Sequence, residues 1–252
     1  MNRIEMFKRH LDEKRAIKII AGIDNFDMQR VKNVVTAADM GGASAVDICY
    51  DEKIIAMVKD MTSLPVFVSS VVPSELANAV RLGADAIEVG NFDAMYKKGV
   101  RVSANEVLEI VKETKKLLGE MKTFMCVTVP GHIDISEQIS LAIKLEEMGI
   151  DLIQTEGAAI SSPTKSGARG LMQMAEVSIS NTVELSRNTS IPIMTASGLT
   201  TTTVPLAFAA GASAIGAGSC VNKLNSVVAM IAVVKSLVEC TNRSIKHDFV
   251  NA

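Results

Sequence analysis

A repeated opening of four strands constrains the fold of this chain more than any other feature of its sequence. Each repeat begins with glycine and continues into a short apolar run: Gly-Gly-Ala-Ser-Ala-Val-Asp (41–47), Gly-Ala-Asp-Ala-Ile-Glu (83–88), Gly-Ile-Asp-Leu-Ile-Gln (149–154) and Gly-Ala-Ser-Ala-Ile-Gly (211–216). Glycine is favoured where a helix ends, because its backbone adopts left-handed conformations without the steric cost of a Cβ. The repeats therefore predict four places where a helix stops and a strand begins.

Strand-like apolar runs alternate with amphipathic stretches along the whole chain. Strands are predicted near 17–23, 44–49, 65–71, 85–90, 123–129, 151–156, 191–197 and 213–218. Helices are predicted near 27–40, 51–61, 73–82, 103–119, 136–148, 170–189, 203–210 and 222–240. Two strands between the glycine repeats share a different opening, Leu-Pro-Val (64–66) and Ile-Pro-Ile (191–193), so the pattern repeats every two strands. Eight units in 252 residues predict an α/β fold, a single (βα)8 TIM barrel over residues 1–252, rather than a doubly wound sheet.

The two ends of the chain differ from the repeating units. Residues 1–16 are predicted to form a short N-terminal helix, and residues 241–252 a polar C-terminal tail. The first residues have no continuous apolar run and carry several acids, which argues against a secretory signal and against a transit peptide.

Composition narrows the classes of partner. A net charge of −2 without a basic stripe gives no sign of a nucleic-acid or membrane partner, and a soluble protein is expected. Four cysteines and three histidines are scattered without metal-ligand spacing, so no metal site is predicted. A homo-oligomer is compatible with the sequence, which does not define an oligomeric state.

The glycine repeat also supplies a register for the strands. The reference glycines are Gly42, Gly83, Gly149 and Gly211. The residues five positions after them are Asp47, Glu88, Gln154 and Gly216. In this fold each interior layer takes four side chains from alternate strands, so these residues are predicted to form one layer inside the barrel. Two positions further, at the mouth of the barrel, lie Cys49, Gly90, Glu156 and Gly218.

Two carboxyl groups in one buried layer should shift each other's pKa values apart, so that one is protonated and the other is ionised. That division suits general acid–base chemistry. We therefore predict that Asp47 and Glu88 share this role, with Glu156 as an alternative base at the rim. The alternative reading is a structural hydrogen-bonded layer that also includes Gln154. Lys18 is predicted at the start of its strand, at the wrong end for chemistry, which disfavours a Schiff-base aldolase.

Two motifs follow the last two predicted strands. They are Thr-Ala-Ser-Gly-Leu (195–199) and Gly-Ala-Gly-Ser (216–219). Barrels of this kind hold phosphorylated ligands with the loops after strands seven and eight, where glycines let backbone N–H groups approach the oxygens. We predict a phosphate site made by Ser197, Gly198, Gly218 and Ser219; tight strand–helix turns are the alternative reading.

Further polar residues lie at predicted strand ends and are candidates for substrate contact. Asp24 either contacts the ligand or caps the first barrel helix, Asn91 follows the fourth strand, and His132 is expected to be exposed or to contact the ligand. Gln154 is predicted to contact substrate from the interior layer. The long loop 156–170 contains Lys165, which is predicted to close over an anionic ligand. The stretch 95–101 offers a second cationic wall or a solvated charge run.

Several segments together resemble a known family. Ile-Ala-Gly-Ile-Asp-Asn-Phe-Asp (20–27), Ile-Glu-Val-Gly-Asn-Phe-Asp (87–93), Gln-Thr-Glu-Gly (154–157), Ala-Ser-Gly-Leu (196–199) and Val-Asn-Lys-Leu-Asn-Ser (221–226) are similar to the hypothetical chloroplast open reading frame twenty-three family. The likeness covers essentially the whole chain. It implies an aldolase-type, ribulose-phosphate-binding-like barrel in the chloroplast stroma, encoded by the plastid, or in the cyanobacterial cytoplasm. It supplies no catalytic residues.

Three functions remain open. The first is a cofactor-independent isomerase, lyase or synthase acting on a small phosphorylated metabolite. The second is an oxidoreductase that binds flavin mononucleotide (FMN) through the same phosphate site, although no cation is evident at a strand end near the flavin ring. The third is a non-catalytic metabolite sensor or assembly protein.

Overall fold

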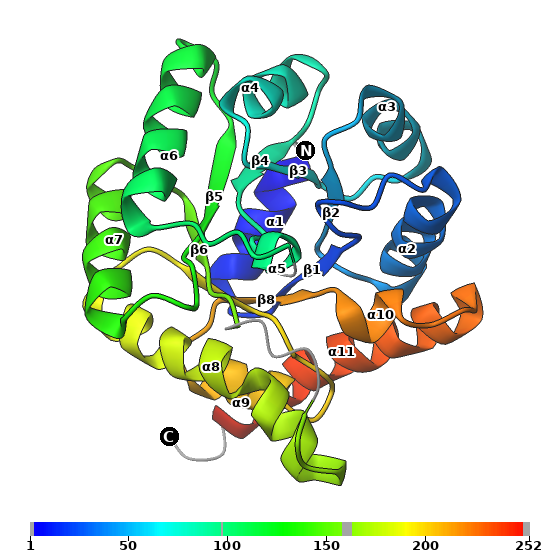
Figure 1. The fold of residues 1–252 in the computed structure, drawn as a ribbon. Coiled ribbons are helices and arrows are strands. Elements are labelled where there is room, and N and C mark those ends of the chain that lie inside the picture. Colours follow the sequence, from blue (N-terminus) through cyan, green and yellow to red (C-terminus); the bar gives the residue numbers. More distant parts are fainter. Residues whose placement is uncertain (1–2, 97, 158–162, 249–252) are drawn as a thin grey trace.

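A closed barrel of eight parallel strands forms the centre of the protein. The computed structural model describes residues 3–96, 98–157 and 163–248. The strands are β1 (Ala16–Ile20), β2 (Ala45–Cys49), β3 (Val66–Ser70), β4 (Ala86–Val89), β5 (Phe124–Thr128), β6 (Leu152–Gln154), β7 (Ile193–Ala196) and β8 (Ala214–Ala217). Each strand pairs with the next, and β8 pairs with β1 (Figure 1). The predicted fold class is confirmed.

Helices surround the barrel in alternation with the strands (Figure 1). They are α2 (Met28–Gly41), α3 (Glu52–Met61), α4 (Pro73–Arg81), α6 (Ala104–Leu118), α7 (Ile135–Glu147), α8 (Gly167–Asn188), α9 (Val204–Ala209) and α11 (Val227–Asp248). Two single-turn helices, α5 (Asp93–Tyr96) and α10 (Ser219–Asn222), lie in the loops after β4 and β8. These two turns belong to the end of the barrel at which the strands finish, and the sequence pattern did not predict them.

The glycines of the repeat have the backbone conformation that the prediction requires. Gly42, Gly83, Gly149 and Gly211 have φ angles of 82°, 89°, 69° and 105°. At the other end of α2, the side chain of Asp27 accepts hydrogen bonds from the amides of Gln29 and Arg30. Asp27 is therefore the cap of this helix, and the capping role considered for Asp24 is wrong.

Side chains alternate between the barrel interior and the shell beneath the helices. In β2, Val46 and Ile48 belong to the apolar shell, whereas the carboxylate of Asp47 contacts Lys18 inside the barrel. The same alternation separates Ile87 of β4 from Glu88. The predicted register therefore aims the two acids at the axis, as expected from the repeat.

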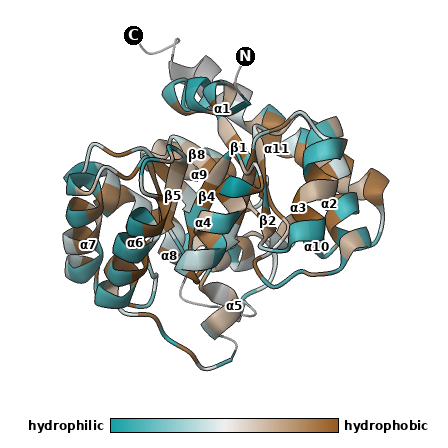
Figure 2. Ribbon diagram, turned by 90° about the horizontal axis from the view of Figure 1, so that it is seen from above, coloured by the Kyte–Doolittle hydropathy of each residue, from teal (hydrophilic) through white to brown (hydrophobic). Residues whose placement is uncertain are grey.

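Helix α1 (Arg3–Asp12) closes the amino-terminal end of the barrel. Its Phe7 packs edge-on against Phe67 of β3 and Phe124 of β5, with ring centroids 5.1 Å and 5.9 Å away. Ile4 and Leu11 flank Phe7 in the same apolar cluster. Figure 2 shows α1 and α5 at opposite ends of the barrel. Helix α1 thereby keeps water out of the amino-terminal end of the barrel interior.

The last helix, α11, packs along α2 and reaches Asp248. Residues 241–248, predicted as part of a polar tail, are therefore helical. No glycine or proline interrupts the sequence there, and an established helix continues through polar residues without needing an apolar face. Within the described part of the chain, no helix is both long and apolar enough to cross a membrane.

Candidate functional site

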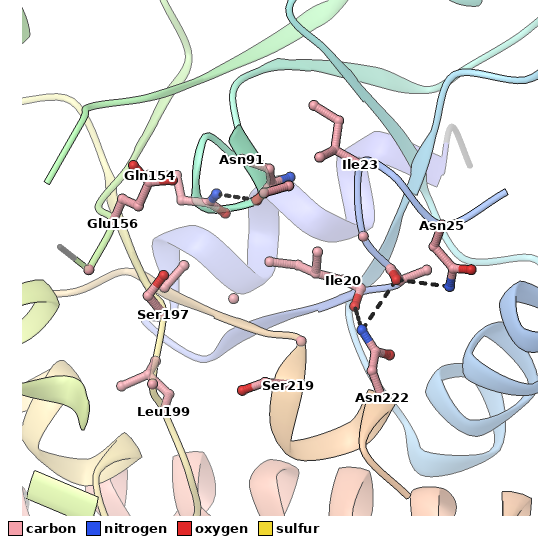
Figure 3. A pocket seen from close by; sticks show the side chains of 18 of the residues that line it. Ile20, Ile23, Asn25, Asn91, Gln154, Glu156, Ser197, Leu199, Ser219 and Asn222 are labelled. Carbon is pink, nitrogen blue, oxygen red and sulfur yellow. Dashed lines mark hydrogen bonds between the residues drawn. The ribbon is translucent and has the colours of Figure 1, made fainter. Parts of the chain in front are cut away.

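A cavity of about 680 Å3 opens at the carboxyl-terminal end of the barrel. Loops after β1, β4, β6, β7 and β8 form its wall together with part of α8 (Figure 3). The predicted site residues on this wall are Asp24, Asn91, Gln154, Glu156, Ser197, Gly198, Gly218 and Ser219. Asp47 and Glu88 lie beneath the wall rather than on it. The cavity therefore brings the predicted phosphate residues together with one predicted base, Glu156.

Beneath the cavity, a lysine and two carboxylates form a buried ionic layer. Lys18, Asp47 and Glu88 are at most 1% exposed. The ammonium group of Lys18 contacts the carboxylate of Glu88 and lies 3.3 Å from Oδ2 of Asp47. The prediction that Lys18 lies at the wrong end of its strand is wrong. Because β1 spans Ala16–Ile20, Lys18 occupies its middle and faces inward.

Burial and neighbouring charge act in opposite directions on this layer. Burial alone would lower the pKa of Lys18, but the carboxylates of Asp47 and Glu88 outweigh it and raise that pKa. Burial raises the pKa of Glu88, and Asp47 adds to the effect while Lys18 opposes it. A lysine held as ammonium is a poor nucleophile, so this pairing disfavours Schiff-base chemistry at Lys18.

Hydrogen-bond donors complete the layer around each carboxylate. Ser69 Oγ donates to Oδ1 of Asp47 at 2.5 Å, and Asn91 Nδ2 donates to Oδ2 at 3.0 Å. Thr128 Oγ1 donates to Oε1 of Glu88 at 3.1 Å. Gln154 Nε2 donates to the same oxygen at 2.7 Å. The predicted Asp–Glu–Gln layer therefore exists, and Asn91 and Gln154 connect it to the cavity.

At the rim, Glu156 belongs to a second hydrogen-bonded group. Tyr96 Oη donates to Glu156 Oε2 at 2.5 Å, and His132 Nδ1 lies 3.0 Å from the same hydroxyl. A hydroxyl has one proton, so the Tyr96 hydroxyl that donates to Glu156 must accept from His132. The Nδ1–H tautomer of His132 follows. Burial lowers the pKa of His132, and the nearby Arg101 adds to this shift.

The turn after β7 forms the first half of the predicted phosphate site, here called the cradle. Ser197 and Gly198 both have left-handed backbone, with φ angles of 76° and 72°. A Cβ on Gly198 would overlap the carbonyl oxygen of Met174 in α8, so only glycine fits there. A serine with positive φ stores strain of about 1 kcal/mol or more, which the surrounding packing must offset.

The second half of the cradle is the turn that starts α10. Within α10, the first amides that bond back to Gly218 are those of Val221 and Asn222. The amides of Ser219 and Cys220 precede that turn and have no acceptor inside the helix. Gly218, Ser219 and the opposing Ser197–Gly198 turn all line the cavity, so they can present N–H and O–H groups to a single anion.

Three residues on the cavity wall were missed by the sequence reasoning. Arg30 and Lys223 line the cavity and are exposed cations. Asn222 Nδ2 donates to the carbonyl groups of Ile20 and Ala21, at 2.9 Å and 3.2 Å, and so ties α10 to the end of β1 (Figure 3). The segment Val-Asn-Lys (221–223), quoted above for the family resemblance, was the available signal.

The described cations of the two predicted cationic loops do not line the cavity. Lys165 is exposed and does not lie on the wall. The neighbouring Thr164 is bonded to Gln173 of α8. Ser161 and Ser162 of the same predicted lid lie outside the described residues, as does Lys97 of the second cationic wall. Among the residues that the structure does describe, no cluster of His, Cys, Asp or Glu could hold a metal ion.

The fold is shared with a solved enzyme structure. The (S)-3-O-geranylgeranylglyceryl phosphate synthase of Thermoplasma acidophilum, in complex with its substrate sn-glycerol-1-phosphate, superposes with a TM-score of 0.65. That comparison covers 96% of this chain and 99% of that chain at 16% sequence identity. At such identity the likeness shows the fold alone.

Sequence comparison defines the family. The ycf23 protein of Pyropia yezoensis, itself called uncharacterized, is 36% identical over 94% of this chain and 86% of its own length. The ycf23 protein of Cyanophora paradoxa is 36% identical over 96% of this chain and 98% of its own length. These relatives come from plastid genomes of algae. The family model described as protein of unknown function (DUF561) matches residues 1–247, and the chain therefore belongs to this ycf23 family.

Proposed function

We propose that this protein is an enzyme acting on a small phosphorylated metabolite, with no cofactor taking part. The observation that carries the proposal is the meeting of two features in one cavity. Glycine- and serine-rich turns after β7 and β8, which carry backbone N–H and hydroxyl groups, line the cavity, and Glu156, which is only 3% exposed, lies on the same wall. Anion donors and a buried base together suit proton transfer on a phosphate ester.

The phosphate group would bind between the Ser197–Gly198 turn and the start of α10. Arg30 and Lys223 on the same wall would add positive potential along the approach of an anion. Glu156 would exchange a proton with the ligand, because this residue lines the cavity beside the cradle. Tyr96 and His132 would hold this carboxylate in place. The phosphate substrate of the synthase that shares this fold supports the same class of ligand.

The structure changes the roles that we assign to Asp47 and Glu88. Both face inward as expected, but Lys18 neutralises one of their charges and neither side chain reaches the cavity wall. We therefore assign proton transfer to Glu156 and a supporting role to the ionic layer. An isomerase, a lyase and a synthase all remain compatible with one base beside a phosphate site.

The test is a binding screen against phosphorylated metabolites by thermal shift, followed by calorimetry on those that stabilise the protein. Inorganic phosphate and unphosphorylated analogues serve as reference ligands. Ser219→Asp places a negative charge in the cradle and is expected to weaken binding at least tenfold. Ser63→Asp introduces the same charge at an exposed site away from the cavity and should bind like wild type. The proposal is contradicted if no phosphorylated compound binds, or if the two variants behave alike.

Two further measurements separate the alternatives. An absorption scan of the purified protein in the visible range reveals bound FMN, whose phosphate would use the same cradle. Phosphorus NMR of the protein mixed with a binding metabolite shows turnover as a new resonance, and loss of that resonance in Glu156→Gln supports the assigned base. Binding without turnover would identify a sensor. As compartment we propose the chloroplast stroma or the cyanobacterial cytoplasm, supported by the plastid-genome relatives.

A further inference from the structure

The side-chain amide of Gln154 has one fixed orientation. Its Nε2 donates to Glu88 Oε1 at 2.7 Å and to Thr128 Oγ1 at 3.1 Å. It also donates to Asn91 Oδ1 at 3.2 Å, the bond drawn in Figure 3. Asn91 Nδ2 donates to Asp47, which leaves Asn91 Oδ1 to accept from Gln154, so the NH2 group of Gln154 must face Asn91 and Glu88. The carbonyl oxygen Oε1 is therefore turned away from the ionic layer.

That carbonyl oxygen is an unused acceptor beside the cavity. Gln154 is 2% exposed, and within the described part of the chain its Oε1 has no hydrogen-bond partner. A Cβ on Gly216 would lie 3.2 Å from this oxygen and 3.0 Å from Cδ1 of Ile20. All three residues line the cavity, so the missing side chain of Gly216 leaves Oε1 next to its floor. Oε1 is itself covered, so a ligand that reaches it would displace a neighbouring side-chain end, such as Cδ1 of Ile20.

We propose that Gln154 determines specificity by accepting a hydrogen bond from a hydroxyl group of the phosphorylated ligand. Glu88 is the positioning residue, because its carboxylate fixes the direction of the amide. The inference rests on the proposed function and adds the substrate class: sugar or polyol phosphates, which carry hydroxyl donors. A carboxylate or ketone at this point would place two acceptors face to face and would be rejected.

The ionic layer thereby acquires a role without entering the cavity. Lys18 opposes the effect of burial on the pKa of Glu88 and so favours its carboxylate form. The carboxylate accepts from the NH2 group of Gln154, which leaves the carbonyl oxygen of Gln154 directed at the ligand. With Gln at position 88, that side chain offers both a donor and an acceptor, and the orientation of the Gln154 amide is no longer enforced. Discrimination for the hydroxyl group should then fall while the cradle itself stays in place.

Binding of two matched probes tests this inference. Glycerol 1-phosphate carries two hydroxyl groups, and n-propyl phosphate has the same carbon chain without them. Calorimetry on the wild type is expected to give at least tenfold tighter binding of glycerol 1-phosphate, since a buried acceptor is left unpaired by the other probe. The ratio of the two dissociation constants is expected to fall toward one in Gln154→Met and in Glu88→Gln.

Gln138 provides the matched control. It is also a buried glutamine, 3% exposed, whose Oε1 has no partner in the described chain, but it lies on α7 away from the cavity. Gln138→Met should keep the wild-type ratio. Two results would overturn the inference: equal binding of both probes by the wild type, or an unchanged ratio of dissociation constants in Gln154→Met. Either result would leave the proposed function standing. If neither probe nor inorganic phosphate binds, the proposed function fails and the inference fails with it.

Discussion

Removal of the Lys18 ammonium group should destabilise the protein, because the buried carboxylates of Asp47 and Glu88 then lose the positive charge that balances them. In Lys18→Met the carboxylates of Asp47 and Glu88 keep their hydrogen bonds to neutral groups but lose the only ammonium group that contacts them in the described structure. Breaking a buried ion pair by deleting one partner costs about 3–5 kcal/mol, because an uncompensated charge remains. We expect the free energy of unfolding at pH 7 to fall by about this amount.

The pH dependence of this loss follows from Glu88. Burial and Asp47 already raise its pKa above the ordinary 4.5, and the variant loses the opposing effect of Lys18. Above pH 4.5 the folded variant then holds a proton that the unfolded chain releases, so its stability falls as pH rises toward the folded pKa. One such proton is worth about 1.4 kcal/mol per pH unit. Between pH 5 and pH 7 the variant should therefore lose more stability than wild type does.

Urea unfolding followed by far-UV circular dichroism at several pH values measures these differences. Lys112→Met removes an exposed lysine whose salt bridge to Glu109 spans 2.7 Å, and it should cost less than about 1 kcal/mol at every pH. Adding Glu88→Gln to Lys18→Met should recover stability at pH 7 and remove the extra slope. A Lys18→Met protein within about 1 kcal/mol of wild type, with a parallel pH profile, would refute the reasoning.

Two further predictions concern backbone strain and a titrating histidine. Gly198→Ala should destabilise the protein strongly and abolish binding of phosphate esters, because the added Cβ overlaps the Met174 carbonyl oxygen. Gly149 has a similar φ of 69° but open space around it. Gly149→Ala should therefore lower the free energy of unfolding in urea by only about 1 kcal/mol and keep binding. Burial, reinforced by nearby arginines, lowers the pKa of His10, so its stabilising effect is present above about pH 6.5 and is lost as pH falls through the folded pKa. The stability of wild type relative to His10→Gln should therefore decrease between pH 8 and pH 5; a constant difference would show that His10 titrates alike in both states.

The parts of the fold that could be predicted are those set by local sequence. A glycine that ends a helix fixes where the next strand begins, and the two-residue period of the strand then decides which side chains face inward. Asp47 and Glu88 were placed inside the barrel by this reasoning, which needed no contact between distant segments. The Ser197–Gly198 turn was likewise found because its chemistry lies in adjacent residues.

The parts that could not be predicted depend on the closure of the barrel. Lys18 meets Glu88 across the interior, and an error of one or two residues in the start of β1 was enough to place its side chain at the wrong end. A lysine inside an apolar run, in a protein with two inward-facing acids, was the signal that would have revealed the pair. Tyr96, His132 and Glu156 come from three loops, and no local pattern indicates that these loops meet.

The helix below the barrel has a consequence for the order in which the molecule is made. Phe7 precedes the rings that receive it, Phe67 and Phe124, by 60 residues or more, so it leaves the ribosome before either of them. Helix α1 therefore cannot complete its packing until β5 has been made, although its own residues precede all eight strands.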